Sequence, residues 1–148
     1  MPTPTDTAAL LVHAINAGDE TALSDVLAED VALEAPPGVR RRGVAASARY
    51  MMSWVSAFPG CRLLCVRQLV AGEWVVQELR FQGTHSATLE GEGEDWGATG
   101  RSLDLEMALF GHYQHRLALE LRFYFDRLDL MTQLGLMSRY PMALEETR

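Results

Sequence analysis

The stretch Ser102–Phe125, SLDLEMALFGHYQHRLALELRFYF, decides the fold of this chain. Apolar residues alternate with others on both sides of a polar turn at 114–116, which predicts antiparallel strands over 102–113 and 117–125. Because side chains in a strand alternate between faces, and a three-residue turn keeps the register, the odd-numbered residues should share one face. That apolar face comprises Leu103, Leu105, Met107, Leu109, Leu117, Leu119, Leu121, Phe123 and Phe125. We expect helices or a cavity to cover it.

The other elements follow from the same periodicities. Helical spacing of apolar residues predicts helices at 8–17, just after Asp19, at 44–58 and at 127–134. Strands are expected at 31–33, 62–70, 74–82 and 84–89, followed by a Gly-rich loop at 90–100. This order, helices and then hairpins, predicts an α+β fold rather than a parallel α/β fold. We expect one domain over residues 1–148, with residues 1–6 and 141–148 flexible.

Charge and composition exclude several functions. The chain has 13 basic and 20 acidic residues, for a net charge of −7. Nucleic acid and anionic membranes would repel this charge, so we expect neither as a partner. All the basic residues are arginine, which excludes Schiff-base chemistry on a lysine amine. The single basic cluster, Arg40-Arg41-Arg42, is expected in a solvated loop.

The cysteines and the N-terminus suggest a cellular location. Cys61 and Cys65 fall in one predicted strand, where four residues span about 13 Å, beyond the reach of a disulfide. Residues 1–7 contain no apolar segment like that of a signal sequence, and no apolar run is long enough to cross a bilayer. The sequence therefore predicts a protein of the reducing cytoplasm.

Five short motifs together resemble one family. They are Phe58-Pro-Gly60, Phe81-Gln-Gly-Thr-His-Ser86, Thr99-Gly-Arg101, Tyr124-Phe-Asp126 and Gln133-Leu-Gly135. This set resembles the SnoaL-like polyketide cyclases and their ester cyclase relatives, of the nuclear transport factor 2-like superfamily. The resemblance implies a curved antiparallel sheet wrapped with helices into a cone around an apolar pocket. It also implies a homodimer, and an intramolecular aldol reaction that needs no cofactor and no metal.

The resemblance also implies that the family's acid/base pair is missing. In those cyclases an aspartate lies three residues before the position of Asp126, and a histidine lies fourteen residues before that aspartate. Here these positions hold Phe123 and Leu109, and neither side chain can transfer a proton. Asp126 itself is expected to cap the last helix. The ligand-binding residues implied for a small apolar or aromatic ligand are Trp54, Leu105, Met107, Leu109, Leu121 and Phe123.

Two other residues are weak catalytic candidates. His85 is either a polar group near the pocket or a hydrogen-bonded structural histidine. Glu78 would have a raised pKa and act as a base if its face of the strand looked inward, but the neighbouring Gln77 leaves that orientation open. His112 and His115 could bracket a metal, but no third ligand is near in sequence, so a surface turn is preferred.

These observations leave two main functions open, beside a purely structural or partner-binding role with the cavity collapsed. The first is a small-molecule-binding domain with an apolar pocket that lacks the cyclase acid/base pair. The second is a cofactor-free cyclase, isomerase or hydrolase that uses another acid or base. The carboxylates in the 90–95 loop would repel a phosphate, so we interpret that loop as a lid carrying Trp96. For assembly we expect a homodimer through the polar sheet face, where Phe110 and Tyr124 lie among charged residues.

Overall fold

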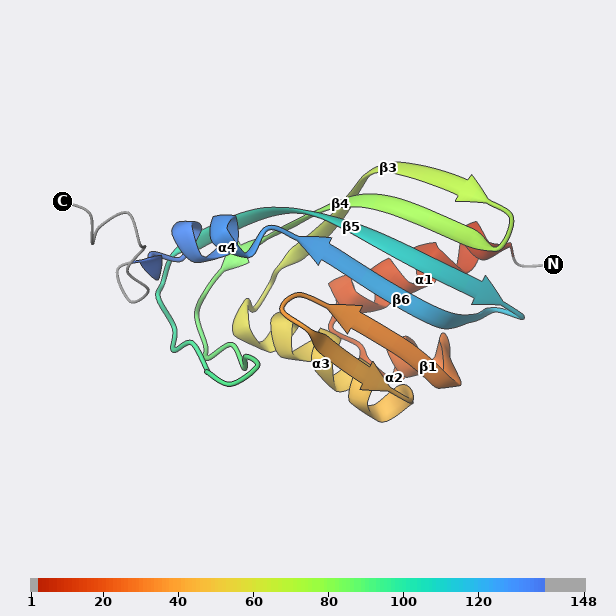
Figure 1. The fold of residues 1–148 in the computed structure, drawn as a ribbon, viewed down its shortest axis with the longest axis horizontal. Coiled ribbons are helices and arrows are strands. Elements are labelled where there is room, and N and C mark those ends of the chain that lie inside the picture. The colour runs from red at the N-terminus through yellow and green to blue at the C-terminus, as the bar shows by residue number, and fades with distance from the viewer. Residues whose placement is uncertain (1–2, 138–148) are drawn as a thin grey trace.

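A six-stranded sheet frames the protein in the computed structural model, which describes residues 3–137. Its strand order is β2-β1-β6-β5-β4-β3 (Figure 1). The strands are β1 (Leu27–Ala35), β2 (Val39–Arg42), β3 (Arg62–Ala71), β4 (Trp74–Thr84), β5 (Ser102–Gln114) and β6 (Leu117–Phe125). The helices are α1 (Pro4–Ala17), α2 (Glu20–Asp25), α3 (Val44–Ala57) and α4 (Arg127–Gln133). The predicted α+β class is confirmed.

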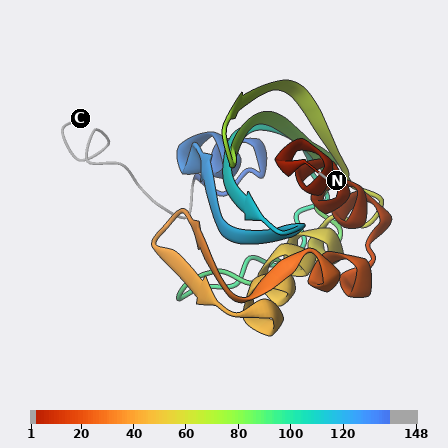
Figure 2. The ribbon, with the colours of Figure 1, turned by 90° about the vertical axis from the view of Figure 1, so that its right-hand side faces the viewer.

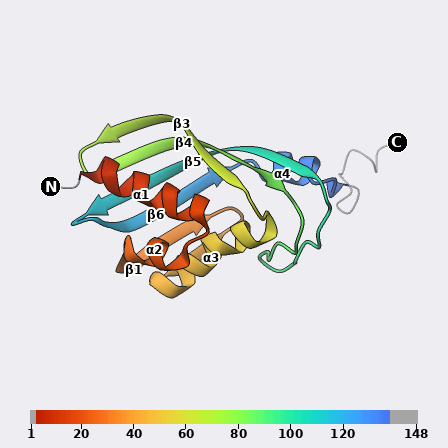
Figure 3. The same cartoon turned by 180° about the vertical axis from the view of Figure 1, so that it is seen from behind.

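The sheet is curved, and α1, α2 and α3 gather on one side of it (Figure 1). Figure 2 shows the strands bent around the helices, and Figure 3 shows α1 and α3 lying across the same face of the sheet. The odd-numbered residues of β5 point to that face, where Leu103, Leu105 and Leu109 are buried in the core. The prediction that β5 has one apolar, inward face is therefore confirmed. Neighbouring strands are antiparallel except for β1 and β6, which run parallel, unlike the fully antiparallel sheet expected.

In the β5–β6 hairpin a two-residue turn and a bulge replace the three-residue turn that was predicted. Its turn has two residues, His115 and Arg116, both with positive φ (52° and 68°). Such a turn alone would pair odd residues with even ones, but the register shifts between His112 and Tyr113, which leaves Leu119 as an extra residue. From the bulge to Phe125, the odd residues of both strands face inward as predicted. Between the turn and the bulge the prediction is wrong, because Ala118 is completely buried whereas Leu117 and Leu119 are only partly buried.

Three further expectations are corrected. The first helix begins at Pro4 rather than residue 8, because Thr3 and Asp6 form a reciprocal capping box. Residues 4–6 thus belong to this helix, while residues 1–2 and 141–148 lie outside the described part of the chain. Arg40–Arg42 forms β2, paired with β1, rather than a loop. The strand predicted at 84–89 is reduced to one bridge between Leu89 and Trp96.

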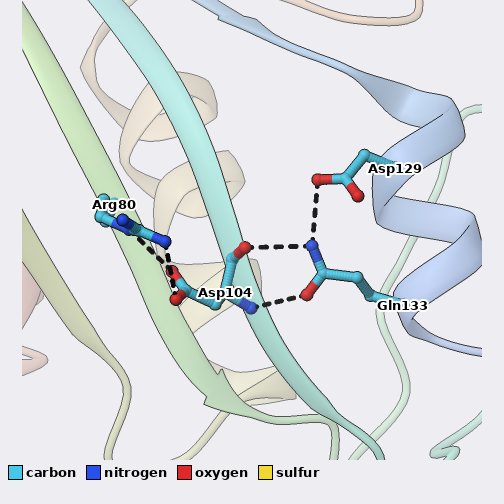
Figure 4. Close-up of polar contacts among 4 residues, drawn as sticks. All are labelled: Arg80, Asp104, Asp129 and Gln133. Carbon is cyan, nitrogen blue, oxygen red and sulfur yellow. Dashed lines mark hydrogen bonds and ion pairs between the residues drawn. The ribbon is translucent and has the colours of Figure 1, made fainter.

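Helix α4 is fixed to β5 by the side chain of Gln133 (Figure 4). Its Oε1 accepts a hydrogen bond from the Asp104 backbone N–H at 2.8 Å, and its Nε2 donates to the Asp104 carbonyl at 3.0 Å. The same Nε2 donates to Asp129 at 3.0 Å, while Arg80 donates two hydrogen bonds to the Asp104 carboxylate. The amide of Gln133 therefore pairs with the backbone of Asp104 as a residue of an adjacent strand would, and it fixes the last turn of α4 beside the start of β5.

Candidate functional site

A cavity of about 370 Å³ lies where four segments meet. Its walls come from the β1–β2 connection and β2, from α3, from the Gly-rich loop around residues 89–96, and from β6 and the start of α4. Aromatic side chains from three of these segments line it: Tyr50, Trp54, Trp96 and Phe125. Three arginines and three glutamates also line it: Arg41, Arg49, Arg127, Glu90, Glu92 and Glu94.

A second, apolar pocket of about 40 Å³ adjoins this cavity. Tyr50, Trp54 and Phe125 line both spaces, and the remaining walls of the pocket are Ile15, Met51, Leu63, Phe81, Met107 and Phe123. A space of this size holds no more than about one or two water molecules. The apolar pocket expected from the sequence is therefore almost filled by its own side chains, and the open volume lies in the neighbouring cavity with the charged wall.

Trp54 is the centre of the aromatic wall between the two spaces. Its ring contacts Phe81 and Phe125 edge to face, each at 5.6 Å between centroids, and stacks on Phe58 at 6.0 Å. Phe58 in turn contacts Phe81 edge to face at 5.3 Å. Edge-to-face pairs of this kind hold rings in fixed orientations. The rings of this wall are thus fixed by their mutual contacts, and Trp54 and Phe125 border both spaces.

Tyr50 is the one ionisable side chain that lines the apolar pocket. Burial raises the pKa of its phenol, and this outweighs the lowering caused by a hydrogen bond from Trp54 and by the charge of Arg41. The phenol therefore stays protonated at neutral pH and serves as a hydrogen-bond donor, not as a base. The Arg41 guanidinium lies over the Tyr50 ring, 5.8 Å from its centroid.

The six predicted ligand-binding residues divide into two groups. Trp54, Met107 and Phe123 line the apolar pocket, and Trp54 also lines the larger cavity. Leu105, Leu109 and Leu121 line neither space, because each is completely enclosed in the core behind the pocket wall. Sharing the inward face of a strand is not sufficient to reach the cavity, since the curvature of the sheet covers some positions with helices.

His85 is buried and lies outside both cavities. The Thr99 backbone N–H donates to its Nδ1 at 3.3 Å, which places the proton of the neutral ring on Nε2, and the Thr99 hydroxyl lies 3.0 Å from the same Nδ1. Phe58 stacks on the ring at 5.1 Å. Burial lowers the pKa of the imidazole, although backbone groups of Trp96 and Ala87 partly oppose this. The environment is that of a structural histidine.

Glu78 lies on the opposite face of the sheet from both cavities. Its neighbour Gln77 points inward, where it is buried and donates a hydrogen bond to Gln68 at 3.2 Å. Glu78 is exposed and lines neither cavity. The orientation that the sequence left open is settled, and it removes Glu78 from the neighbourhood of any enclosed space.

The histidines of the β5–β6 hairpin also lie away from the cavities. His112 is 3.0 Å from the Glu73 carboxylate and stacks on Trp74 at 4.8 Å, while His115 forms the turn. Within residues 3–137 no three His, Cys, Asp or Glu side chains gather as metal ligands would. In the same residues no helix is long and apolar enough to cross a membrane. Cys61 and Cys65 are both free thiols.

The motifs behind the family resemblance support the scaffold of the site. Thr99 holds His85, and Gln133 fixes α4 to β5. Asp126 caps α4 by accepting hydrogen bonds from the backbone N–H groups of Leu128 and Asp129. A Cβ at Gly135, where φ is +73°, would lie only 2.6 Å from Nε of Arg101. These motifs place the loop and α4 around the cavity, and its charged wall is made by other residues.

Sequence reasoning missed that charged wall. Arg41 was expected in a solvated loop, yet it lies on β2 and contacts both Tyr50 and Glu92. Arg127 follows the capping residue of α4, and its guanidinium lies 5.2 Å from the centroid of the Trp96 ring. No local pattern indicated these contacts, because each joins segments that are distant in sequence.

Three kinds of comparison place the chain among known proteins. The model of the SnoaL-like polyketide cyclase family matches residues 5–134. A search of curated proteins found no match. Among solved structures, a SnoaL-like protein from Jannaschia sp. CCS1 superposes with a TM-score of 0.79 at 16% identity, over 94% of this chain and 93% of that one.

Two further structures share the fold. IdmH from Streptomyces antibioticus has a TM-score of 0.74 and 24% identity, over 90% of this chain and 99% of its own. An LEH-like epoxide hydrolase from M. tuberculosis has a TM-score of 0.69 and 15% identity, over 89% of each chain. At these identities the structures establish the fold alone. With the family model matched over nearly its whole length, the chain belongs to the SnoaL-like polyketide cyclase family.

Proposed function

We propose that this protein binds a small, flat, largely apolar molecule and does not carry out the cyclase reaction by the acid/base pair of its family. The observation that carries the proposal is the chemistry of the apolar pocket. Of its nine lining residues only Tyr50 is ionisable, and burial raises the pKa of that phenol. An aldol closure requires a base to remove a proton from carbon, and a neutral phenol is not one.

The larger cavity supports binding. Its volume of about 370 Å³ falls within the range typical of small-molecule sites, roughly 300–1,000 Å³. Trp54, Trp96 and Phe125 offer aromatic surface against which a planar ligand can pack. Because Trp54 and Phe125 also border the apolar pocket, part of such a ligand could extend toward Met107 and Phe123 with small side-chain movements.

A cofactor-free enzyme remains the second candidate, and one observation favours it. Glu90 and Glu94 line the larger cavity, where a carboxylate could accept a proton while the phenol of Tyr50 donates a hydrogen bond to a developing oxyanion. The shared fold does not decide between the two, since one structural neighbour is an epoxide hydrolase.

The proposed binding protein is a cytoplasmic homodimer. Two exposed aromatic side chains on the outer sheet face, Phe110 and Tyr124, are 38% and 51% exposed and contact each other edge to face at 5.6 Å. With Trp74, Glu120 and Arg122 they line a shallow groove. This mixture of aromatic and charged groups is typical of interfaces, and the free thiols of Cys61 and Cys65 suit a reducing compartment.

The test combines binding with turnover. A thermal-shift screen of polycyclic aromatic compounds should give ligands that raise Tm by about 5–10 °C at a concentration near one hundred times Kd. Trp54→Leu should reduce that shift, while Trp74→Leu, on the outer face, should not. A parallel assay with a polyketide ester should show no cyclisation above background. Turnover that survives Tyr50→Phe, Glu90→Gln and Glu94→Gln would contradict the proposal, because it would require another proton-transfer group.

A further inference from the structure

Arg127 is a half-buried cation in the cavity wall, and no carboxylate of residues 3–137 pairs with it. Its guanidinium lies over the Trp96 ring at 5.2 Å. A guanidinium removed from bulk water, with an aromatic face on one side and an open cavity on the other, favours a planar anion that can accept several of its hydrogen bonds.

Arg41, in the same cavity wall, shows how such a guanidinium accepts a carboxylate. It lies over the Tyr50 ring at 5.8 Å, an aromatic contact like that of Arg127, and it donates to the Glu92 carboxylate at 2.6 Å. Glu92 comes from the Gly-rich loop, between Gly91 and Gly93. The cavity thus already holds a carboxylate on one of its arginines, supplied by the chain itself, whereas no carboxylate from the described part of the chain occupies the equivalent position on Arg127.

We propose that the ligand of this cavity is an aromatic carboxylate, with its rings against Trp54 and Trp96 and its carboxylate on Arg127. The inference rests on the proposed function and adds the chemical class of the ligand. Glu92 opposes binding, because its negative charge lies in the same cavity and neutralises Arg41. The loop carboxylate and the ligand carboxylate therefore compete for the positive potential of the two arginines.

The other glutamates of the cavity do not reverse this preference. Glu90 and Glu94 are exposed on the loop, where water and salt screen their charge. Arg127 and Arg41 are partly buried against aromatic rings, where the effective dielectric constant is lower and charge interactions are stronger. Although the lining contains as many carboxylates as guanidiniums, two of the three guanidiniums, Arg41 and Arg127, are partly buried, whereas Arg49 and the three glutamates are exposed.

The experiment is a calorimetric titration of the full chain at pH 7.5 with 2-naphthoic acid and with 2-naphthamide. The two molecules share their rings and differ in the charge of one group. We expect the acid to bind about tenfold or more tightly than the amide, because hydrogen bonds to charged groups are the strong ones. In Arg127→Gln the two affinities should become equal within about twofold, with amide binding unchanged.

Two variants make the result specific. Arg40→Gln removes the same charge from β2 at a side chain that is 83% exposed and faces away from the cavity, so the preference for the acid should persist. Glu92→Gln should tighten binding of the acid severalfold and leave the amide unchanged. If Arg127→Gln does not fold, the inference can still be tested with Glu92→Gln. Because Glu92 is on an exposed loop, we expect that variant to fold.

The possible failures are distinguishable. Equal affinity of acid and amide for the wild-type protein would overturn the inference and leave the proposed binding function intact. A preference for the acid that persists in Arg127→Gln and disappears in Arg40→Gln would overturn the assignment to Arg127. Failure of both compounds, and of the wider aromatic screen, would contradict the proposed function itself.

Discussion

Leu109 and Phe123 are direct partners across the β5–β6 pair. Leu109 is completely enclosed in the core, whereas Phe123 is 8% exposed and lines the apolar pocket. The family resemblance assigns a histidine and an aspartate to these two positions. An imidazole and a carboxylate here would face one another across the hairpin, but the present pair can only pack, and it closes the wall of the pocket.

The first prediction concerns Phe123. Phe123→Asp should lower the free energy of unfolding by about 3 kcal/mol or more, because an unpaired carboxylate would be buried among apolar side chains. Such a loss corresponds to a fall in Tm of roughly 10 °C for a chain of this size. Leu69→Asp, at a side chain of β3 that is 63% exposed, is the control and should change Tm little. A Phe123→Asp protein as stable as the control would place this side chain at the surface.

The second prediction concerns Gly111, which pairs with Val75 and Leu121 in the middle of the sheet. A Cβ at this position would overlap the buried ring and hydroxyl of Tyr113. Gly111→Ala should therefore lower the free energy of unfolding by about 1–3 kcal/mol in chemical denaturation, and Tyr113→Leu in the same chain should restore part of the loss. Gly97→Ala, with open space around the new methyl group, is the matched control. Equal stability of the two alanine variants would contradict the prediction.

A third prediction concerns the docking of α4 by Gln133. Gln133→Glu keeps the shape of the side chain but loses the donor to the Asp104 carbonyl and places a charge near Asp129. We expect a loss of about 1–3 kcal/mol and faster hydrogen exchange throughout α4. Thr132→Ala, on the exposed side of the helix, should change neither measurement. Unchanged exchange in Gln133→Glu would show that other contacts hold the helix.

The last prediction concerns pH. Burial lowers the pKa of His85 from its ordinary value of 6.5, so the folded protein binds the proton less readily than the unfolded chain. Between 6.5 and the lowered pKa, stability should fall as the pH falls, because protonation favours the unfolded state in that window. Tm measured from pH 7.5 to 5 should therefore show a weaker dependence in His85→Gln than in wild type. His13→Gln, at an exposed position, should keep the wild-type dependence.

The fold could be predicted from the sequence better than the candidate site could. Alternation identified the inward face of β5 because most of that face is buried in the core. The same reasoning failed for β2 (Val39–Arg42), since this strand at the sheet edge has four residues and a single buried apolar side chain, too few for an alternating pattern to show in the sequence. It also failed between the turn and the bulge at Leu119. A single extra residue there changes which side chains face the core, and nothing in the composition of the strand indicates it.

Local sequence patterns could not predict the charged cavity, and the reason is different. Arg41, Tyr50, Glu92 and Arg127 come from a strand, a helix, a loop and a second helix, and they meet only when the sheet has curved. Motif resemblance could not supply them either, because the matched motifs act on the scaffold, as Gln133 and Asp126 do. A site assembled from such distant segments depends on the tertiary fold.

The parallel pairing of β1 with β6 has a consequence for synthesis of the chain. Leu33 aligns with Leu121, so β1 cannot pair on this side until β6, about 90 residues later, has left the ribosome. Until then β1 has only the short β2 beside it, and its apolar residues and one backbone edge stay open to other chains. Assembly of the cavity therefore has to wait for β6, and the nascent protein is most vulnerable to aggregation just before this strand emerges.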